Sequence, residues 1–414
     1  MFQYLQGQLH CEQVDLKVLA AQHGTPAYVY SKNMILQRWN DYQQALNGIP
    51  SRVCFAVKAN SNLAVLATLA RACAGFDIVS GGELQRVLKA GGSAASIVFS
   101  GVGKTPQEIA LALDQSIHSF NCESEAEIAL ISQIASAKQK KASIAIRVNP
   151  DVNAKTHPYI STGLREHKFG VDINAAEEIY HRAAQLPGII AEGVSCHIGS
   201  QLLEIDPLLE AADKTLALVA RLRSGGLPIH FLDLGGGLGV QYRPHETNAS
   251  IGEFASRLRP KLASLDLTLM LEPGRSIVAE AGILLTQVLL IKQNGAKTFV
   301  IVDGAMNDLL RPALYQAHHE ITPVTEIPTD LTITVDVVGP VCETGDFFAR
   351  DRRLPALKPG DLIALRTAGA YGFVLSSNYN SRPRPCELLI DGTRVHVART
   401  RETFDDLVRG ESLP

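Results

Sequence analysis

The chain has 414 residues, of which 46% are hydrophobic and 20% charged, and its 39 Lys and Arg against 42 Asp and Glu residues give a net charge of −3. This composition is typical of a globular protein, and the length predicts two domains, one of which can be large. The longest basic run is KQKK at 138–141, and no apolar segment reaches the roughly 18 residues that a membrane span needs. We therefore expect neither a nucleic-acid partner nor a membrane segment.

The amino terminus and the cysteines bear on the compartment. The first ten residues, MFQYLQGQLH, have neither the basic nor the apolar region of a secretory leader, which favours a cytoplasmic protein. The seven cysteines form no CxxC pair. We expect free thiols, with no structural zinc site and no disulfide framework.

Short β-branched runs alternate with helical patterns between residues 52 and 272, which is typical of a parallel sheet built from βα units. Eight strands are predicted: Arg52–Val57, Gly75–Val79, Ser96–Ser100, Ile117–Asn121, Ser143–Val148, Ile190–Ile198, His230–Leu234 and Leu267–Leu271. Eight units over about 220 residues favour an α/β fold with a (β/α)8 TIM-type barrel. A doubly wound open sheet is the alternative.

The sequence on either side of this region has a different character. After Arg275 the chain continues in β-rich runs without long helices: Thr298–Val302, Leu331–Val338, Leu362–Leu365, Cys386–Ile390 and Arg394–Ala398. These runs predict a second, all-β domain of Greek-key barrel or sandwich type. A helix at Val14–His23 and a strand at Ala27–Tyr30 begin the chain, and the pattern alone assigns them to neither domain.

The connection after the fifth predicted strand, residues 149–169, is polar and longer than most loops. It contains His157, Ser161 and Arg165. We interpret it as a lid that excludes water from a site at the mouth of the barrel.

Catalytic groups of a (β/α)8 barrel gather at the carboxyl ends of its strands. Five predicted strands contain or end in polar side chains of this kind: Lys58, Asp77, Arg147, His197 with Ser200, and Glu272 with Arg275. Lys58 is the sharpest signal, because an amine buried on an apolar strand is held toward the neutral, nucleophilic form that Schiff-base chemistry needs. The alternative is a lysine that extends from the strand end into solvent.

The run LDLGGGLG at 232–239 follows the seventh predicted strand, and its glycines allow backbone N–H groups to approach an anion without interference from a Cβ atom. Barrel phosphate sites use the loops after strands seven and eight, so this run and EPGR at 272–275 favour a phosphate-bearing cofactor over a simple tight turn. Val240 stands where a dinucleotide motif needs its last glycine, and Val98 stands where a P-loop ending in GVGKT needs its first. The sequence therefore contains neither nucleotide motif.

A lysine, a phosphate site and a buried carboxylate at one barrel mouth are the groups that pyridoxal phosphate requires. Lys58 would form the Schiff base, the glycine run would hold the phosphate, and Glu272 would keep the pyridine nitrogen protonated. Two simpler interpretations stay open at this point. Glu272 could be an ion-pair partner of Arg275, and a histidine such as His197 is more often a satisfied strand residue than a ring-stacking group.

A series of motifs in a fixed order covers nearly the whole chain. With DLGGGLG and EPGR it includes FAVKAN at 55–60, FDIVSGGEL at 76–84, RVNPDV at 147–152, HPYISTG at 157–163, KFG at 168–170, CHIGSQ at 196–201, MNDLLRPALYQA at 306–317, GPVCETGDFFARDR at 339–352 and GAYGFVLSSNYN at 369–380. In this order and spacing the motifs resemble the alanine-racemase-fold (fold-type III) pyridoxal phosphate enzymes, and among them the diaminopimelate decarboxylase family.

The resemblance implies a role for each matching residue. Lys58 would be the Schiff-base lysine, His197 would stack on the cofactor ring and Glu272 would lie at the pyridine nitrogen. The implied phosphate-binding residues are Ser200, Gly236, Gly237, Pro273, Gly274, Arg275 and Tyr371. The implied substrate-binding residues are Arg275, Arg311, Tyr315, Glu343 and Tyr371, and Cys342 would donate the proton. The family pattern contains no metal site.

The resemblance also implies an assembly and a reaction. A barrel of residues 31–275 would bind the cofactor, and residues 1–30 and 276–414 would form the β-rich domain. The enzyme would be a head-to-tail homodimer in which Cys342 and Glu343 reach the cofactor of the partner subunit. The implied reaction removes carbon dioxide from meso-2,6-diaminopimelate to give L-lysine, the last step of lysine biosynthesis.

The residue types fit a substrate with two amino-acid ends, because arginine clamps a carboxylate and a carboxylate such as Glu343 suits a distal ammonium. A same-fold decarboxylase of ornithine or arginine would have no distal carboxylate for Arg311 and Tyr315 to hold. A non-catalytic pyridoxal phosphate-binding regulator is a further alternative, and Lys58 and Cys342 argue against it. Taken singly, Cys342 could be a small buried apolar residue, Arg311 a surface charge and Tyr315 core filling.

Overall fold

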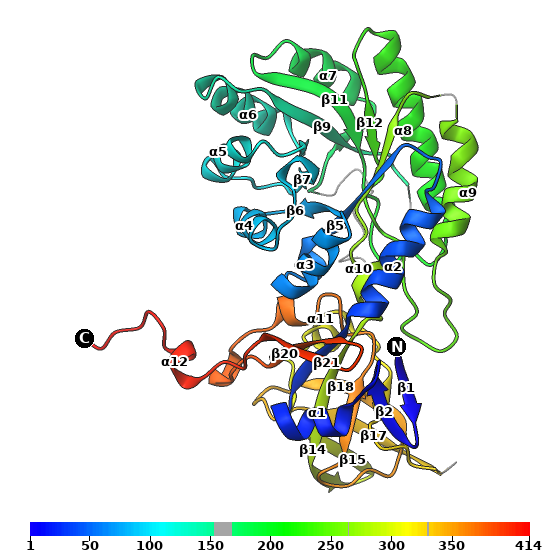
Figure 1. Cartoon of the computed structure of the whole chain (residues 1–414), viewed down its shortest axis with the longest axis vertical. Helices are drawn as coiled ribbons and strands as arrows, with labels where there is room; N and C mark the ends of the chain where they lie inside the picture. Colours follow the sequence, from blue (N-terminus) through cyan, green and yellow to red (C-terminus); the bar gives the residue numbers. More distant parts are fainter. Residues whose placement is uncertain (153–167, 264, 329–330) are drawn as a thin grey trace. The chain divides into compact units, whose positions relative to one another are not determined.

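The computed structural model describes residues 1–152, 168–263, 265–328 and 331–414, and it divides the chain into two compact units (Figure 1). The barrel unit contains Arg38–Val240 and Thr247–Ser276, and the β-rich unit contains Met1–Gln37, Gln241–Glu246 and Ile277–Pro414. Within the described ranges, no helix combines the length and the apolar character needed to cross a membrane. The predicted lid at 149–169 falls mostly outside the described residues, and so do its His157, Ser161 and Arg165.

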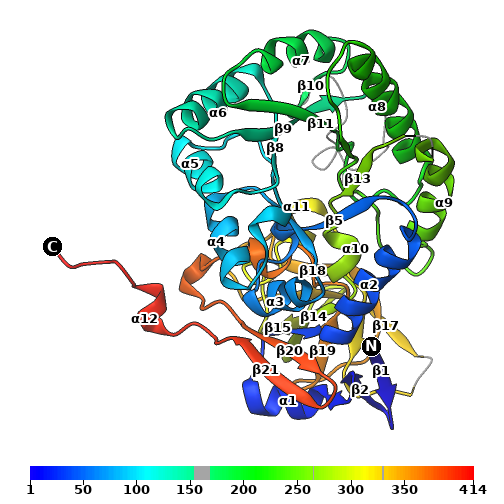
Figure 2. The same cartoon turned by 45° about the horizontal axis from the view of Figure 1, so that its top comes forward.

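Eight parallel strands form the closed ring of the barrel unit, with helices around the outside (Figure 2). In ring order they are β5 (Ser51–Ala56), β6 (Gly75–Ile78), β7 (Ile97–Phe99), β8 (Ser119–Cys122), β9 (Ala142–Asn149), β11 (Ile189–Ser195), β12 (Phe231–Asp233) and β13 (Thr268–Leu271). The short β10 (Val171–Asp172) pairs with β9 and extends the ring sheet beside it. The predicted (β/α)8 barrel is confirmed, and the open-sheet alternative is wrong because β13 pairs with β5 and β8 with β9.

Several helices of the barrel begin at side-chain caps after the strand-end loops. The barrel helices are α3 (Leu63–Arg71), α4 (Gly81–Lys89), α5 (Pro106–Gln115), α6 (Glu125–Ala137), α7 (Ala176–Ala184), α8 (Asp206–Ser224) and α9 (Ile251–Leu262), and α2 (Lys32–Ala45) precedes β5. The side chains of Asn62, Ser80, Thr105 and Ser124 accept first-turn N–H bonds of α3, α4, α5 and α6. These caps fix where each helix begins, and therefore keep short the loops that carry the site.

Glycine makes room for a large side chain in the barrel core. Cys54, Val98, Ala145, Phe231 and Met270 form a buried cluster from five strands. A Cβ atom at Gly193 in β11 would lie 2.1 Å from Cζ of Phe231. The register of β11 against β9 also shifts between Ala191 and Gly193. Only glycine at 193 therefore allows the Phe231 ring to fill this part of the core.

A mixed sheet of nine strands dominates the β-rich unit. Its main path is β18 (Phe347–Pro355), β17 (Thr332–Val338), β15 (Lys297–Val302), β14 (Gly282–Asn294), β4 (Ala27–Ser31), β20 (Cys386–Asp391) and β21 (Arg394–Arg399), with β16 (Ile321–Pro323) and β19 (Leu362–Leu365) attached. A second sheet holds β1 (Phe2–Leu5), β2 (Gln8–Cys11) and β3 (Val14–Asp15). The short helices are α1 (Leu16–His23), α10 (Arg275–Val278), α11 (Arg311–Tyr315) and α12 (Phe404–Leu407). The predicted separate β-rich domain is confirmed.

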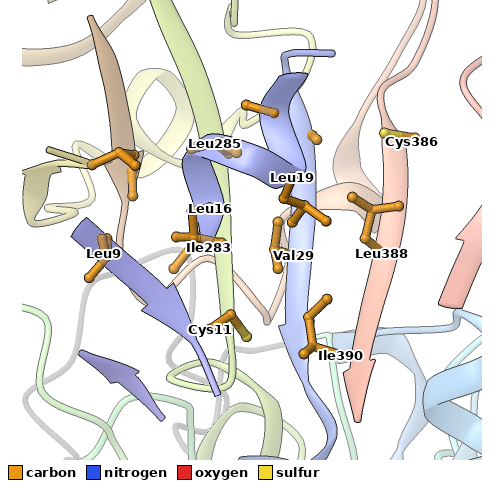
Figure 3. Close-up of a cluster of buried hydrophobic side chains, with 14 residues drawn as sticks. Leu9, Cys11, Leu16, Leu19, Val29, Ile283, Leu285, Cys386, Leu388 and Ile390 are labelled. Carbon is orange, nitrogen blue, oxygen red and sulfur yellow. The ribbon is translucent and has the colours of Figure 1, made fainter. Parts of the chain in front are cut away.

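The start of the chain belongs to this β-rich unit. β4 pairs antiparallel with β14 and parallel with β20. Side chains of β2, α1, β4, β14 and β20 then meet in one buried cluster, in which Leu16 and Leu19 of α1 lie with Val29, Ile283 and Leu388 (Figure 3). The N–H of Lys17 donates to the Asp15 carboxylate at 2.7 Å and so caps α1. The apolar face of an amphipathic helix thus covers the sheet that its own chain enters next.

We expect Gly193→Ala to lower the free energy of unfolding by about 2 kcal/mol, because the added methyl group overlaps the Phe231 ring and overpacks the core. Denaturant unfolding followed by circular dichroism measures this change. Gly103→Ala is the matched control, since no heavy atom lies within 4 Å of a Cβ atom placed at Gly103. The control should change the unfolding free energy by less than about 0.5 kcal/mol. Equal stability of the two variants would contradict the packing described here.

Candidate active site

Lys58 lies in the single turn η1 (Val57–Ala59) that follows β5, at the carboxyl end of the barrel. Its Nζ atom is 2.7 Å from Oδ2 of Asp77, in the neighbouring strand β6. The Asp77 side chain is fully buried, whereas 39% of the Lys58 side chain is exposed. The expectation of a desolvated amine is therefore wrong: the amine extends past the end of the strand, and a buried carboxylate fixes its position.

Glu272 follows β13 and lies in a buried polar cluster with side chains from other strand ends. Its Oε1 atom accepts hydrogen bonds from Ser100 Oγ at 3.3 Å and from Asn121 Nδ2 at 3.1 Å. The same Asn121 nitrogen is 3.0 Å from Oδ2 of Asp233, and Asp233 Oδ1 accepts the N–H of Gly235 at 2.8 Å. Glu272 therefore faces this cluster, which favours a site role over the simple ion pair with Arg275.

The carboxyl groups of Glu272 and Asp233 influence each other. Burial raises the pKa of Glu272 well above its ordinary value, and the nearby carboxylates of Asp233 and Asp77 raise it further. Burial also raises the pKa of Asp233, while hydrogen bonds from Glu272 and Asn121 oppose that rise. Both shifts have the same direction, so the pair favours retention of a proton, as expected for two carboxyl groups that share one buried site.

His197 lies beyond the end of β11 and contacts the glycine loop that follows β12. The N–H of Gly236 donates to His197 Nδ1 at 3.3 Å, so Nδ1 is an acceptor and the proton of the neutral ring is on Nε2. Burial lowers the pKa of His197 well below its ordinary value, and the cations of Arg147 and Lys58 lower it further. The ring is therefore neutral, and it belongs to the loops of the site and not to the strand.

The glycines at 235–237 occupy positions that a side chain would block. A Cβ atom at Gly236 would lie 2.3 Å from the carbonyl oxygen of Glu272, and one at Gly235 would lie 2.7 Å from His197 Nδ1. Gly237 has a φ angle of +114°, which other residues rarely adopt. Its carbonyl accepts the N–H of Leu202 at 2.9 Å. The loops after β11 and β12 are thereby held together as a backbone-lined cradle.

Ser200 and Arg275 supply side chains beside this cradle. Nε and Nη2 of Arg275 lie 3.3 and 3.0 Å from Ser200 Oγ. Arg275 is buried and Ser200 is half-buried. A guanidinium, a hydroxyl and glycine backbone are groups that bind a phosphate ester.

The barrel mouth as a whole fits a pyridoxal-type cofactor. It offers an amine for the aldehyde at Lys58, a carboxyl group of raised pKa for a ring nitrogen at Glu272, and the cradle for a phosphate. Oδ1 of Asp77 and Oδ1 of Asn121 are also buried without a hydrogen-bond partner among the described residues. Unsatisfied acceptors of this kind are expected where a ligand contributes donors.

A second buried network supports the site from β8 and β9. Arg147 Nη1 is 3.0 Å from Glu123 Oε1, and Arg147 Nη2 donates to the carbonyl of His197 at 3.4 Å. Lys104, in the GVGKT sequence, donates to the carbonyl of Asn121 at 2.8 Å and to Glu127 at 2.5 Å. Lys104 is thus the interior partner of Glu127 and not a nucleotide-binding lysine.

Two of the remaining sequence-predicted residues lie in a loop of the β-rich unit. Cys342 and Glu343 are exposed between β17 and β18. The N–H of Cys342 donates to Asn380 Oδ1 at 2.9 Å, and the Tyr379 hydroxyl donates to Glu343 Oε2 at 3.4 Å. The interpretation of Cys342 as a small buried residue is therefore wrong.

Arg311 and Tyr315 come from α11 of the same unit. Arg311 is buried, and its guanidinium carbon is 4.5 Å from the ring centroid of Tyr242. It is therefore not a surface charge. Tyr315 and Tyr371 are half-buried, so Tyr315 does not fill the core. The φ angle of Tyr371 is +55°.

Comparison with known proteins identifies the family of the chain. The family model described as "Pyridoxal-dependent decarboxylase, pyridoxal binding domain" matches residues 32–279. The diaminopimelate decarboxylase of Pseudomonas aeruginosa is 54% identical over 100% of this chain and 99% of its own length, and that of Vibrio cholerae is 50% identical over 98% and 97%. The chain belongs to the diaminopimelate decarboxylase family.

Solved structures of diaminopimelate decarboxylases have the same fold. The Helicobacter pylori enzyme complexed with L-lysine has a TM-score of 0.92 and 46% identity, and the match covers 95% of this chain and 98% of that one. The M. jannaschii enzyme with L-lysine has a TM-score of 0.94 and 36% identity over 100% and 98%. A Chlorella virus arginine decarboxylase, at 20% identity and a TM-score of 0.81 over 91% and 99%, shares the fold alone.

Three members of the barrel site, Ser100, Asn121 and Asp233, were not expected from the sequence. Ser100 and Asn121 stand at the carboxyl ends of β7 and β8, so the rule that selected Glu272 also selects them. Neutral polar residues are common at strand ends, which hides this signal. Asp233 lies two residues before Gly235, the first residue of the glycine run, and its carboxylate caps the loop by accepting the N–H of Gly235.

In the apoprotein, Glu272→Gln should gain stability relative to the unaltered chain as the pH rises above about 5. A carboxyl group whose pKa is raised on folding binds more protons in the folded state, so it costs stability above its ordinary value of 4.5. Glutamine removes this cost, and the difference in unfolding free energy should grow by up to about 1.4 kcal/mol per pH unit. Denaturant unfolding at several pH values measures it.

Glu125→Gln is the control for this measurement. A hydrogen bond from Arg182 lowers the pKa of the exposed Glu125, so this residue is ionised above pH 5 in both the folded and the unfolded state. The difference in unfolding free energy between Glu125→Gln and the unaltered chain should therefore not change with pH. If the difference for Glu272→Gln is also independent of pH, Glu272 binds no more protons in the folded state than in the unfolded state.

Proposed function

We propose that the chain is a pyridoxal 5′-phosphate-dependent diaminopimelate decarboxylase that converts meso-2,6-diaminopimelate into L-lysine and carbon dioxide, the last step of lysine biosynthesis. The observation that carries this proposal is the 54% identity to the P. aeruginosa enzyme over the full chain. The relatives solved with L-lysine support lysine as the product.

We infer that Lys58, His197, Glu272, Ser200 and Arg275 hold the cofactor, with Gly236, Gly237, Pro273, Gly274 and Tyr371 completing its phosphate site. When bound, pyridoxal phosphate accepts the electron pair that the departing carbon dioxide leaves on the substrate α-carbon. Lys58 provides the amine for the aldehyde, and its contact with Asp77 at 2.7 Å orients that amine. The neutral ring of His197 offers a flat face, held by the N–H of Gly236.

Proton positions follow from the electrostatics of the barrel. Burial and the nearby Asp233 raise the pKa of Glu272, so this carboxyl group can hold a proton and share it with a ring nitrogen. A protonated ring withdraws electrons more strongly. Cys342 would deliver a proton to the substrate α-carbon, and its exposed position leaves the thiol accessible.

Substrate selection follows from charges in the β-rich unit. Arg311 and Tyr315 would bind the distal carboxylate, together with Arg275, and Glu343 with Tyr371 would bind the distal ammonium. The reacting carboxylate would face apolar surroundings, because its charge disappears as carbon dioxide leaves. Ornithine and arginine lack the distal carboxylate, so they leave the buried guanidinium of Arg311 without its ligand.

We further propose a head-to-tail homodimer. The barrel domain of residues 31–275 in one subunit would meet the β-rich domain of residues 1–30 and 276–414 in the other, so that Cys342 and Glu343 serve the cofactor of the partner subunit. The exposure of Cys342 and Glu343 on a loop of the single chain supports this arrangement.

We assign the enzyme to the cytoplasm. All seven cysteines are free thiols, including the exposed Cys73 and Cys342. Free thiols are typical of proteins in reducing compartments.

Carbon dioxide release from a panel of amino acids tests the reaction. We expect turnover of meso-diaminopimelate with L-lysine as product, and no comparable turnover of ornithine or arginine.

Arg311→Ala should lower kcat/KM for meso-diaminopimelate about 100-fold or more, since it removes one partner of a desolvated ion pair. Lys58→Ala should lose both activity and the visible absorbance of bound cofactor.

The same panel separates the alternatives. An ornithine- or arginine-type decarboxylase would keep its turnover after Arg311→Ala. A regulator that only binds pyridoxal phosphate would be coloured but would release no carbon dioxide from any substrate.

The shared active site has its own test. Lys58→Ala and Cys342→Ala should each be inactive alone, whereas a mixture should regain up to about a quarter of the activity, because hybrid dimers contain one site with both native residues. Subunit exchange is confirmed by native mass spectrometry of differently tagged subunits. Complete exchange without recovered activity would refute the shared site.

A further inference from the structure

We propose that Tyr242 and His319 are positioning residues for Arg311, and that they set the affinity of this site for the distal carboxylate of an amino-acid ligand. The inference rests on the proposed function, in which Arg311 binds the distal carboxylate of meso-diaminopimelate. Neither Tyr242 nor His319 belongs to the motifs that the sequence analysis selected. All three residues lie in the β-rich unit.

The three side chains contact one another in pairs. The guanidinium carbon of Arg311 is 4.5 Å from the ring centroid of Tyr242, and Nη1 of Arg311 is 2.9 Å from Nε2 of His319. The rings of Tyr242 and His319 meet edge to face, with centroids 5.5 Å apart and an interplanar angle of 81°. All three residues are buried. One face and one edge of the guanidinium are therefore fixed by neighbouring rings.

The hydrogen bonds determine the charge state of His319. A guanidinium only donates, so His319 Nε2 accepts from Arg311. His319 Nδ1 then carries the proton and donates to the carbonyl oxygen of Arg366, 2.8 Å away. His319 is thus neutral, with its ring orientation fixed from both sides.

A neutral partner suits a residue whose ligand is an anion. A carboxylate in the place of His319 would orient Arg311 equally well, but its negative charge would compete with the substrate carboxylate. The imidazole and the face of the Tyr242 ring hold the guanidinium through a hydrogen bond and a cation–π contact. Neither group brings a formal negative charge.

The backbone on both sides of His319 is held in place. Antiparallel pairing of β16 with β19 places Ile321 opposite Leu365, and the N–H of Arg366 donates to the carbonyl of Glu320 at 2.8 Å. Arg352 Nη1 donates to the carbonyl of His319 at 2.9 Å. The imidazole therefore stands on a rigid sheet edge, as a positioning group requires.

Tyr242 comes from a different part of the chain. It lies in Gln241–Glu246, which follows the glycine loop in sequence but belongs to the β-rich unit. Oε2 of Glu246 accepts the N–H groups of Tyr242 and Arg243 at 2.9 and 3.0 Å, which closes a turn. This turn presents the Tyr242 ring to Arg311.

The test compares two ligands that differ in the carboxylate. L-lysine keeps the distal carboxylate of the proposed substrate, and 1,5-diaminopentane has the same two amines without it. Inhibition constants for both are measured with the holoenzyme. A merely structural role would change both constants alike, whereas a positioning role toward Arg311 changes only that of L-lysine.

The variants are chosen in matched pairs. His319→Asn keeps a donor near the carbonyl of Arg366 but loses the acceptor for Arg311, whereas the longer amide of His319→Gln reaches Arg311. Tyr242→Leu loses the aromatic face, and Tyr242→Phe keeps it. We expect His319→Asn and Tyr242→Leu each to raise the inhibition constant of L-lysine about 10-fold and that of 1,5-diaminopentane less than about 2-fold. The Gln and Phe variants should stay within about 3-fold of the unaltered enzyme.

Steady-state kinetics give a second readout. In His319→Asn and Tyr242→Leu, KM for meso-diaminopimelate should rise more than kcat falls, while the absorbance of the bound cofactor stays unchanged. Thermal unfolding identifies any variant that does not fold, and the other matched pair then decides. The proposal would be overturned if the inhibition constants of both ligands rose equally, or if neither rose.

Arg311→Ala distinguishes failure of this inference from failure of the proposed function. If Arg311→Ala changes the inhibition constants of L-lysine and 1,5-diaminopentane by the same factor, Arg311 does not bind the distal carboxylate and the proposed function is wrong at this residue. If Arg311→Ala raises the inhibition constant of L-lysine more than that of 1,5-diaminopentane, and the His319 and Tyr242 variants do not, only the positioning role is wrong.

Discussion

Three carboxyl groups buried at the carboxyl ends of β6, β12 and β13 impose the constraint on which the barrel site depends. Buried negative charge is costly unless a cation or a proton accompanies it. The amine of Lys58 lies 2.7 Å from Asp77. Asp233 lies beside Glu272, whose raised pKa favours retention of a proton between the two carboxyl groups. A ring nitrogen that takes up this proton would leave a carboxylate beside a cation. The site is thus arranged for a ligand that becomes positively charged when it binds.

The glycine loop connects this electrostatic centre to the cradle beside Ser200 and Arg275. Gly235 is bonded to Asp233 through its N–H, and Gly236 is bonded to His197. A Cβ atom at either position would collide with the backbone of Glu272 or with the imidazole, so the carboxylates, the histidine and the loop must adopt one arrangement together. Changes anywhere in the loop are therefore expected to affect both the ring end and the phosphate end of the cofactor site.

The sequence predicts the fold better than it predicts the interactions within the site. The eight barrel strands are short, apolar and regularly separated by capped helices, so local pattern identifies them. β14 is thirteen residues long but was missed, because its first half is buried without alternation and its second half is exposed. The strand-end rule found Lys58 and Glu272, but the environment of Lys58 depends on Asp77 in the next strand. His319 and Tyr242 are distant from each other in the sequence and belong to none of the motifs, so only the folded chain reveals their contact with Arg311.

The two key cations are paired in opposite ways, and the difference follows from what each must do. Lys58 has a carboxylate partner, which stabilises an ammonium until the amine enters covalent chemistry, and part of its side chain is exposed for that exchange. Arg311 must keep its charge through every turnover, and a guanidinium is effectively always protonated. A neutral imidazole and an aromatic face contact it, and these two groups fix its orientation without adding negative charge themselves. In the proposed function, selectivity for a distal carboxylate would thus depend as much on the neutral residues around the arginine as on the arginine itself.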